Sequence, residues 1–242
     1  MFPQVETSLR LDKRPLEGAH VAIVEEESHL GSVLVHHFLS KEIKAGNSVV
    51  FLGLEQSIGH YHAVGMKSGV NLLKSRESGQ IIFVEALKQL SDAYIDGFDT
   101  LLDRIAGEVF EALTDVVSRR PGIKVTVIID KLTLLLSLGF STRDVFVFVR
   151  KLALKLGEVG GNLVTLCHRT EDKEDCNKLA NVVGEDADLS VVVWPLTSGK
   201  SSSVTGNMRF YWKGSRESGR YQFRTEEKDV KVFALGMSSA VL

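Results

Sequence analysis

The chain has 242 residues, of which 44% are apolar and 25% charged, and its 29 basic and 31 acidic side chains leave a net charge of −2. This composition suits one sizeable globular domain, and the near-neutral charge argues against a protein that coats nucleic acid by itself. Because no apolar run approaches about 20 residues and the start lacks a basic, apolar leader, we expect a soluble, unsecreted chain. The two cysteines, Cys167 and Cys176, match no disulfide or metal spacing, so they are predicted to be free thiols.

Six short apolar runs predict strands that are buried on both faces, because their apolar residues do not alternate with polar ones. Segments with helical periodicity separate the runs, and this alternation is typical of a parallel sheet with crossover helices. The runs cover residues 21–24, 49–54, 81–84, 125–129, 163–166 and 189–194.

Two helices are predicted most clearly between these strands. Apolar residues at spacings of three and four predict an amphipathic helix over residues 98–116, before the stop signal of Pro121 and Gly122. A second helix is predicted over residues 141–156, where apolar residues fall on almost every side. We therefore expect part of the second helix to lie in a contact with another subunit.

After Trp194 the pattern changes to short strands joined by turns, over residues 208–212, 221–224 and 230–234. No internal repeat and no linker rich in Pro or Ser divides the chain. We predict a single domain over residues 1–242 of the α/β class. It is expected to be a three-layer sandwich with a mainly parallel sheet and antiparallel C-terminal strands.

The turn after the first strand decides whether a nucleotide is expected. A P-loop reads G-x-x-x-x-G-K-[ST], because its glycines expose backbone N–H groups to phosphate, its lysine meets the charge and its hydroxyl binds Mg²⁺. When Gly31 is aligned with the second glycine, Glu26 stands in place of the first. The lysine and hydroxyl positions then hold Ser32 and Val33. The three glutamates of residues 25–27 are expected to repel a triphosphate, so we predict a degenerate P-loop and no bound cofactor.

Two acidic residues at strand ends nevertheless resemble those of RecA-like ATPases. Asp130 follows the apolar run 125–129 as in a Walker-B strand, where the carboxylate meets Mg²⁺ or its water. Glu55 follows the run 49–54, where RecA-like ATPases keep the glutamate that polarises the attacking water. Acidic residues at such places also commonly cap neighbouring helices, so neither is specific alone. Together with the order of the elements they favour a RecA-like, P-loop-type fold.

Three other motif-like groups have simpler interpretations. Residues 199–201 (Gly-Lys-Ser) imitate the end of a P-loop but precede a polar stretch that predicts a flexible turn. His36 and His37 point to different faces of a helix, and residues 60–62 (His-Tyr-His) have no third ligand nearby, so no metal site is predicted. No G-x-S-x-G elbow supports a hydrolase.

Charge is unevenly distributed towards the C-terminus. Residues 200–225 hold six basic side chains against one acid, whereas residues 171–188 hold seven acids against two lysines. The basic stretch has interleaved aromatic residues, as an RNA-binding surface would, although a solvated β-meander or packing between oppositely charged subunits would give the same pattern. The acidic stretch is expected in the loop after the fifth strand, where it argues against RNA contact. The candidate RNA-binding residues are Lys200, Arg209, Lys213, Arg216, Arg220 and Arg224, and the interleaved aromatic residues are Tyr211, Trp212 and Tyr221.

Several segments along the chain carry a resemblance to one family. The likeness spans nearly the whole sequence, and its most specific part is the ending, residues 233–242. On these segments the chain resembles the sixth subunit of the Elongator complex. The other matching segments are residues 34–40, 56–57, 60–61, 64–65, 82–85 and 132–139, of which the last reads LTLLLSLG.

The resemblance implies a RecA-like subunit without ATPase motifs of its own, joined with the fourth and fifth Elongator subunits in a hexameric ring. Such a ring binds tRNA and supports modification of the wobble uridine (U34) to carboxymethyl-type derivatives, while another subunit carries the catalysis. We accordingly expect no enzyme activity, no metal and no membrane contact, and a location in the cytoplasm with the nucleus open as a second compartment. Residues 88–97 make a shorter connection than the family usually has before its long helix.

Two other functions stay open on the sequence alone. Glu55 and Asp130 would suit an active ATPase of the recombinase or circadian-clock type, which equilibrium binding of labelled ATP would reveal. The basic residues would suit a standalone RNA-binding module, which would bind tRNA as a monomer with an affinity that falls steeply with salt.

Overall fold

The computed structural model describes residues 2–86, 101–197, 201, 203–215 and 217–235. In these residues nine strands form one sheet, in the order β3-β2-β4-β5-β1-β6-β7-β8-β9. The strands from β3 to β6 in this order pair in parallel, and β7, β8 and β9 continue the sheet antiparallel. The predicted mixed α/β sheet is therefore confirmed. The strands are β1 (His20–Glu26), β2 (Ser48–Gly53), β3 (Ile81–Glu85), β4 (Val125–Ile129), β5 (Asn162–Arg169), β6 (Leu189–Trp194), β7 (Gly206–Trp212), β8 (Ser218–Thr225) and β9 (Val230–Ala234).

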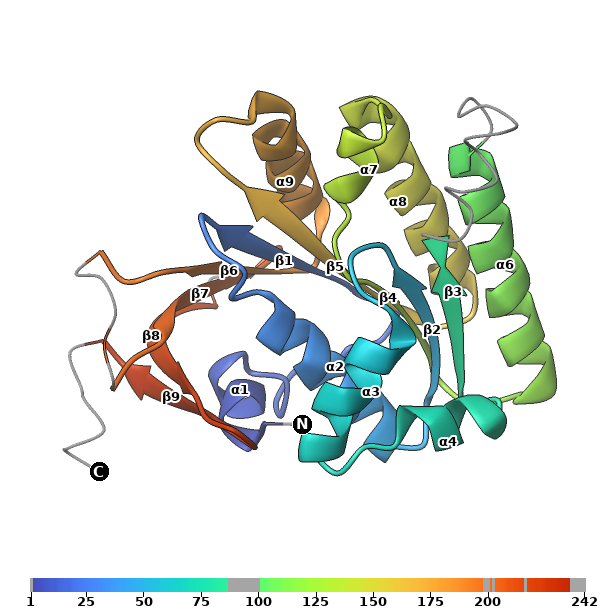
Figure 1. Ribbon diagram of the computed structural model, residues 1–242, viewed down its shortest axis with the longest axis horizontal. Helices are drawn as coiled ribbons and strands as arrows, with labels where there is room; N and C mark the ends of the chain where they lie inside the picture. Colours follow the sequence, from blue (N-terminus) through green and yellow to red (C-terminus); the bar gives the residue numbers. More distant parts are fainter. Residues whose placement is uncertain (1, 87–100, 198–200, 202, 216, 236–242) are drawn as a thin grey trace.

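Helices cover both faces of the sheet and give three layers (Figure 1). One apolar core lies between the sheet and α6, α8 and α9, and the other lies between the sheet and α1, α2, α3 and α4. Because both faces are covered, all residues of β2 and β4 are buried, as their unbroken apolar sequences predict. The helices are α1 (Pro3–Ser8), α2 (Ser32–Lys44), α3 (Ile58–Lys67), α4 (Leu72–Glu77), α6 (Leu101–Arg119), α7 (Leu134–Ser137), α8 (Thr142–Glu158) and α9 (Glu174–Asp186).

Helix α6 confirms the predicted amphipathic helix within the described residues. Ile105, Val109 and Val116 are buried on one face, against the sheet. The chain then turns at Gly122, whose φ of +77° is readily adopted only by glycine. The predicted first helical residues, 98–100, lie outside the described residues.

Helix α8 has one buried apolar face, and further apolar residues lie on its exposed side, as its sequence predicts. Phe148 and four other apolar residues form a buried face, and Phe146 is partly buried against the same core. Arg150, Lys151 and Lys155 share the exposed side with Val147 and Leu154, which are 40% and 64% exposed. The contact of this helix with another subunit stays a prediction, but Phe146 and Phe148 face the core and not a neighbour.

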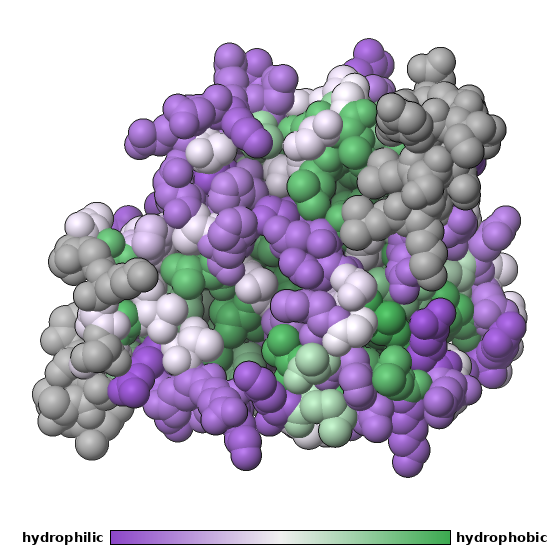
Figure 2. Space-filling view, in the orientation of Figure 1, coloured by the Kyte–Doolittle hydropathy of each residue, from purple (hydrophilic) through white to green (hydrophobic). Residues whose placement is uncertain are grey.

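A patch of partly buried apolar residues lies at α7 and the turn that follows it. Leu134, Leu136, Leu138 and Phe140 pack against the core but keep part of their surface in solvent. Figure 2 shows apolar side chains at the surface over this part of the molecule. These residues, called the α7 patch below, overlap residues 132–139 of the family resemblance.

The three antiparallel strands curl around α1 and α2 (Figure 1). The indole Nε1 of Trp212 donates a hydrogen bond to the carbonyl oxygen of Leu9 (3.0 Å), and the backbone N–H of Val232 donates to Oε1 of Gln4 (2.7 Å). The N-terminal helix is therefore held by strands that come more than 200 residues later.

Both cysteines are buried free thiols, as predicted. Burial raises the pKa of Cys167 to about 12, which keeps this thiol protonated and unreactive at neutral pH. Within the described ranges, every helix is too short or too polar to cross a bilayer.

Candidate functional site

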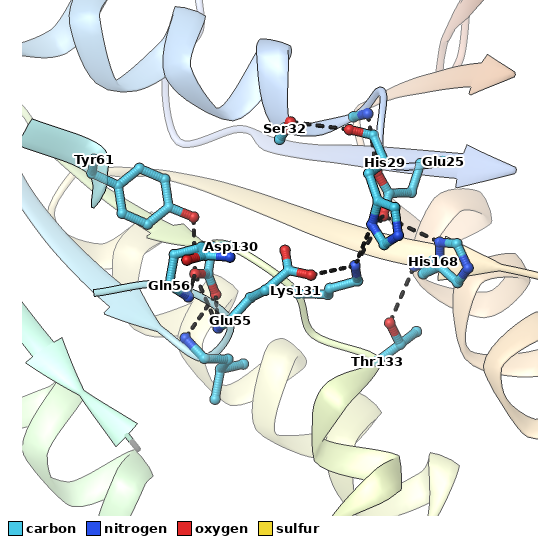
Figure 3. A network of polar contacts seen from close by, with 12 residues as sticks. Glu25, His29, Ser32, Glu55, Gln56, Tyr61, Asp130, Lys131, Thr133 and His168 are labelled. Atoms are coloured by element: carbon cyan, nitrogen blue, oxygen red, sulfur yellow. Dashed lines mark hydrogen bonds and ion pairs between the residues drawn. The ribbon is translucent and has the colours of Figure 1, made fainter. Parts of the chain in front are cut away.

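Four strand ends bring charged residues together at one edge of the sheet. Glu25 lies near the end of β1, Glu55 follows β2, Lys131 follows β4 and His168 lies near the end of β5. Figure 3 shows these side chains converging from separate strands. In open parallel sheets this carboxyl edge is where ligands bind, so it is the place where a nucleotide would be expected.

The carboxylate of Glu25 is turned into the degenerate P-loop. Its side chain is 1% exposed, and Oε2 accepts a hydrogen bond from the backbone N–H of Gly31 (3.0 Å). A Cβ at position 31 would lie 3.0 Å from this oxygen and 2.5 Å from Leu166, so only glycine fits so close to the carboxylate. An N–H of the kind that faces phosphate in a P-loop is thus used by the chain's own carboxylate.

Lys131 supplies the charge that balances this buried carboxylate. Its Nζ lies 3.4 Å from Oε1 of Glu25 and 2.6 Å from Oε1 of Glu55, and the side chain is only 7% exposed. His168 Nδ1 lies 3.1 Å from the same Glu25 oxygen, and its ring stacks on that of His29. The network is therefore a buried cation between two carboxylates, with two imidazoles at its side, and Glu55 is engaged as an ion-pair partner.

Glu26 and Glu27 do not face the loop, so the expected convergence of three acidic side chains was wrong. Glu26 pairs with Arg169 (2.6 Å), and Glu27 accepts the backbone N–H of Glu171 (2.6 Å). Glu26 turns away because successive residues of a strand point to opposite sides, and Glu27 follows the strand with a left-handed φ of +49° that redirects its side chain. The loop is closed by the carboxylate of Glu25 inside it and not by the repulsion of three free charges.

Asp130 lies where a Walker-B aspartate is expected, but its oxygens are occupied by the chain itself. Oδ1 accepts the N–H groups of Leu54 (2.7 Å) and Glu55 (3.2 Å). Oδ2 accepts those of Glu55 and Gln56 and the hydroxyl of Tyr61 (2.9 Å). Burial raises the pKa of the Asp130 carboxyl, and these donors act against the rise by stabilising the carboxylate. Asp130 fixes the loop after β2 and has no free lone pair directed at a metal.

The histidine-rich segments do not form a metal site. The rings of His36 and His60 lie 6.2 Å apart, whereas His37 is buried and accepts the N–H of Phe2. Burial, with His60 as a further cause, lowers the pKa of His36 to about 4. In the part of the chain that the structure describes, no group of three His, Cys, Asp or Glu side chains could hold a metal.

Three of the predicted RNA-binding residues share one face of the antiparallel strands. Arg209 on β7 is the direct partner of Arg220 on β8, and Arg224 lies four residues further along β8 on the same face. Lys213 lies in the turn after β7, where its Nζ donates to the carbonyl of Asp186 (2.9 Å). Lys200 and Arg216 lie outside the described residues. The row Arg209, Arg220 and Arg224 is called the arginine row below.

Only one of the interleaved aromatic residues accompanies this row. Tyr211 is 52% exposed, but Trp212 and Tyr221 face the core side, where Tyr221 stacks on Phe210. Sequence reasoning missed Trp194 at the end of β6, whose ring lies 5.7 Å from the guanidinium of Arg209. The alternation along β7 could have shown that Trp212 faces the core, because residues 208, 210 and 212 share the apolar face of this strand.

The acidic stretch is mostly helix, so the expectation of a loop was wrong. Five of its nine charged residues lie in α9, which packs on β5 and β1. Cys176, Leu179 and Val183 at helical spacing form the buried face. The charged residues between them make this helical spacing hard to recognise in the sequence.

Comparisons with known proteins agree with the sequence resemblance and with the fold. Residues 2–232 match the family model described as Elongation complex protein 6. Proteins named Elongator complex protein 6 from Rattus norvegicus and Homo sapiens are 32% and 33% identical, and that from Danio rerio is 30% identical, each covering 100% of both chains. The crystal structure of a KaiC-like protein from Pyrococcus horikoshii matches with a TM-score of 0.64 at 16% identity, covering 90% of each chain. This likeness confirms the predicted RecA-like fold class.

Proposed function

Because the chain belongs to the Elongator complex protein 6 family, we propose that it is a non-catalytic subunit that joins the fourth and fifth Elongator subunits in a hexameric RecA-like ring. In this proposal the ring binds tRNA and supports modification of the wobble uridine to carboxymethyl-type derivatives. The observation that supports a non-catalytic role is the Glu25 carboxylate on the N–H of Gly31.

A nucleotide would have to displace this carboxylate. A phosphate 4 Å from Glu25 would meet a repulsion of about 4 kcal/mol per charge pair in a partly buried site. Moving Glu25 away would leave the N–H of Gly31 without its hydrogen-bond acceptor and Lys131 without one of its ion-pair partners. Ser32 and Val33 offer neither the lysine nor the hydroxyl of a P-loop, so no gain offsets these costs.

Equilibrium binding of labelled ATP with Mg²⁺ tests this part of the proposal. We expect no saturable binding by the full chain or by the complex with its partner subunits. The variant Ser32→Lys should behave in the same way, because Glu25 still fills the loop. Magnesium-dependent binding or phosphate release that appears in Ser32→Lys but not in the wild type would contradict the role given to Glu25. Binding by the wild type would favour the ATPase hypothesis.

The arginine row supports a contact with RNA. Like charges directly opposite each other on neighbouring strands destabilise a sheet, so the Arg209–Arg220 pair carries a cost that a bound phosphate would remove. Arg220 makes no ion pair within the described residues, whereas Arg209 has a weak one with Glu26 at 3.9 Å. The row thus offers at least one uncompensated positive charge to a polyanion.

Reversal of this charge tests the RNA contact. Arg220→Glu should weaken tRNA binding by the assembled ring and reduce the slope of log K against log salt by about one. The matched control is Lys67→Glu, an exposed charge reversal on α3, which should change neither. Equal effects of the two variants would assign the row to an ordinary solvated surface, and tight binding by the isolated monomer would favour the standalone module.

The α7 patch supports assembly, because apolar side chains at a surface are stabilised when a partner covers them. We propose that this patch, in place of the predicted face of α8, contacts a neighbouring subunit. Leu136→Asp should then prevent co-elution with the partner subunits while circular dichroism stays unchanged. Leu73→Asp on α4, which replaces an exposed leucine elsewhere, is the control. Ring formation by both variants would refute the contact, and copurification from cells would identify the partners directly.

A further inference from the structure

A hollow of about 410 Å³ lies between α9 and strands β6 and β7, beside the arginine row. Val24, Val192 and Ala180 contribute small apolar surfaces to it. Gly184 on α9 also lines it, and a Cβ at that position would already lie 3.4 Å from Ser190 Oγ. The absence of a side chain at this glycine therefore keeps the hollow open.

The polar lining of the hollow contains both donors and acceptors that are not used within the described residues. The side chains of Ser190 and Glu185 make no hydrogen bond or ion pair there. Asn181 accepts a hydrogen bond from Arg169 through its amide oxygen, which leaves its amide nitrogen as a donor. Arg169 Nε is buried without a partner. This mixture of groups suits the edge of a heterocyclic base, which also carries donors and acceptors side by side.

The charges at the mouth of the hollow are nearly balanced. Arg169 pairs with Glu26 at 2.6 Å, and Lys213 lies 3.6 Å from Asp186. Arg209 of the arginine row also lines the hollow and lies 3.9 Å from the same Glu26. A site in which the cations are already paired suits an uncharged group better than a phosphate. The less compensated charge lies outside it, on Arg220, which faces Arg209 across the two strands.

Tyr211 lines the same hollow and is 52% exposed, so its ring is available for stacking. Base stacking on aromatic rings is a main source of affinity for single-stranded nucleic acid, because every base presents a π-face. A base that is paired in a helix cannot enter a recess between a helix and a sheet, so only an unpaired base fits.

We propose that this hollow binds one unpaired nucleobase of an RNA strand, whose phosphates lie along the arginine row. The inference rests on the proposed RNA contact and extends it from a charged surface to a specific site for a single-stranded nucleotide. The hollow is distinct from the ancestral nucleotide position, which lies at the carboxyl edge of the strands and is filled by Glu25.

The test compares a variant that fills the hollow with one that changes only charge. In Gly184→Leu the new side chain occupies the hollow, and leucine is a better helix former than glycine, so α9 should persist. The probe is a fluorescent ten-residue oligouridylate, alone and annealed to its complement, measured with the assembled complex. Gly184→Leu should weaken binding of the single strand about 5- to 100-fold and leave the salt slope unchanged, because no phosphate contact is lost. Gly107→Leu on α6, where a Cβ would meet nothing within 4 Å, is the matched control.

Tyr211→Ala provides a second measurement that does not depend on filling the hollow, and it should weaken binding of the single strand in the same range. If Arg220→Glu weakens binding but Gly184→Leu and Tyr211→Ala do not, the base site is refuted and the RNA surface stands. If none of the three has an effect, both proposals fail. Equal affinity for the annealed duplex, or competition by polyglutamate as strong as that by unlabelled RNA, would overturn the assignment to an unpaired base.

Discussion

Replacement of Asp130 by asparagine tests whether this carboxylate stabilises the fold or serves as a metal ligand. The amide oxygen in Asp130→Asn could still accept the N–H groups of Leu54 and Glu55, but the amide NH₂ would face the N–H of Gln56 and the hydroxyl of Tyr61. The tyrosine hydroxyl can rotate to accept, whereas the N–H of Gln56 loses its partner at a cost of about 1–3 kcal/mol. The remaining bonds lose their charge assistance, which roughly doubles the strength of such bonds.

The free energy of unfolding should therefore fall by about 3 kcal/mol in Asp130→Asn, after some relief from no longer burying a charge. Urea unfolding followed by circular dichroism measures it, and the midpoint should move down by roughly 1 M or more. Tyr61→Phe removes one of the four donors and should cost about 1 kcal/mol. Unchanged or increased stability in Asp130→Asn would refute the structural role, because a carboxylate kept for a metal is not satisfied by the fold.

Two further predictions concern the core and the acid side of the stability curve. Phe148→Asp should unfold the chain, because it buries an unpaired carboxylate at a cost of more than about 4 kcal/mol. Leu154→Asp, at a side chain that is 64% exposed, should leave the circular dichroism spectrum unchanged. Similar behaviour of the two variants would contradict the orientation of α8. Burial lowers the pKa values of His20 and His36 to about 4, so between pH 6.5 and 4 the unfolded chain binds protons that the folded chain does not, and stability falls as the pH falls. Each histidine should contribute a loss of about 2 kcal/mol by pH 5, and His20→Gln or His36→Asn should flatten the decrease measured by urea unfolding; an unchanged pH dependence in both would refute it.

The strands could be predicted because their signal is local. Each predicted run overlaps a strand of the structure, since unbroken β-branched and aliphatic sequences have few alternatives to a sheet covered on both faces. Helix α8 is less well determined by its sequence, because apolar residues lie on several of its sides. The pattern does not reveal that Phe148 faces the core and Leu154 faces outwards.

The closed nucleotide position could be predicted only in part. The sequence shows that the lysine and hydroxyl of a P-loop are missing, but it does not show that Glu25 turns inward or that Lys131, far later in the chain, meets it. That contact depends on the order of the strands, which places β5 between β1 and β4 and lets the residues after β4 reach the end of β1. The hollow beside α9 likewise combines residues from several strands and one helix, so the sequence of no single segment predicts it.

The hold of the C-terminal strands on α1 makes the order of synthesis important for this chain. Leu9 and Gln4 find their partners Trp212 and Val232 only after 203 and 228 further residues have been made. At about 5–20 residues per second, the ribosome leaves the N-terminal helix without these partners for roughly 10–40 seconds. During that time the apolar side of α1 is open to chaperones or to other nascent chains, and a chain that stops before Trp212 never covers it. A chain truncated before Trp212 therefore loses contacts at both of its ends.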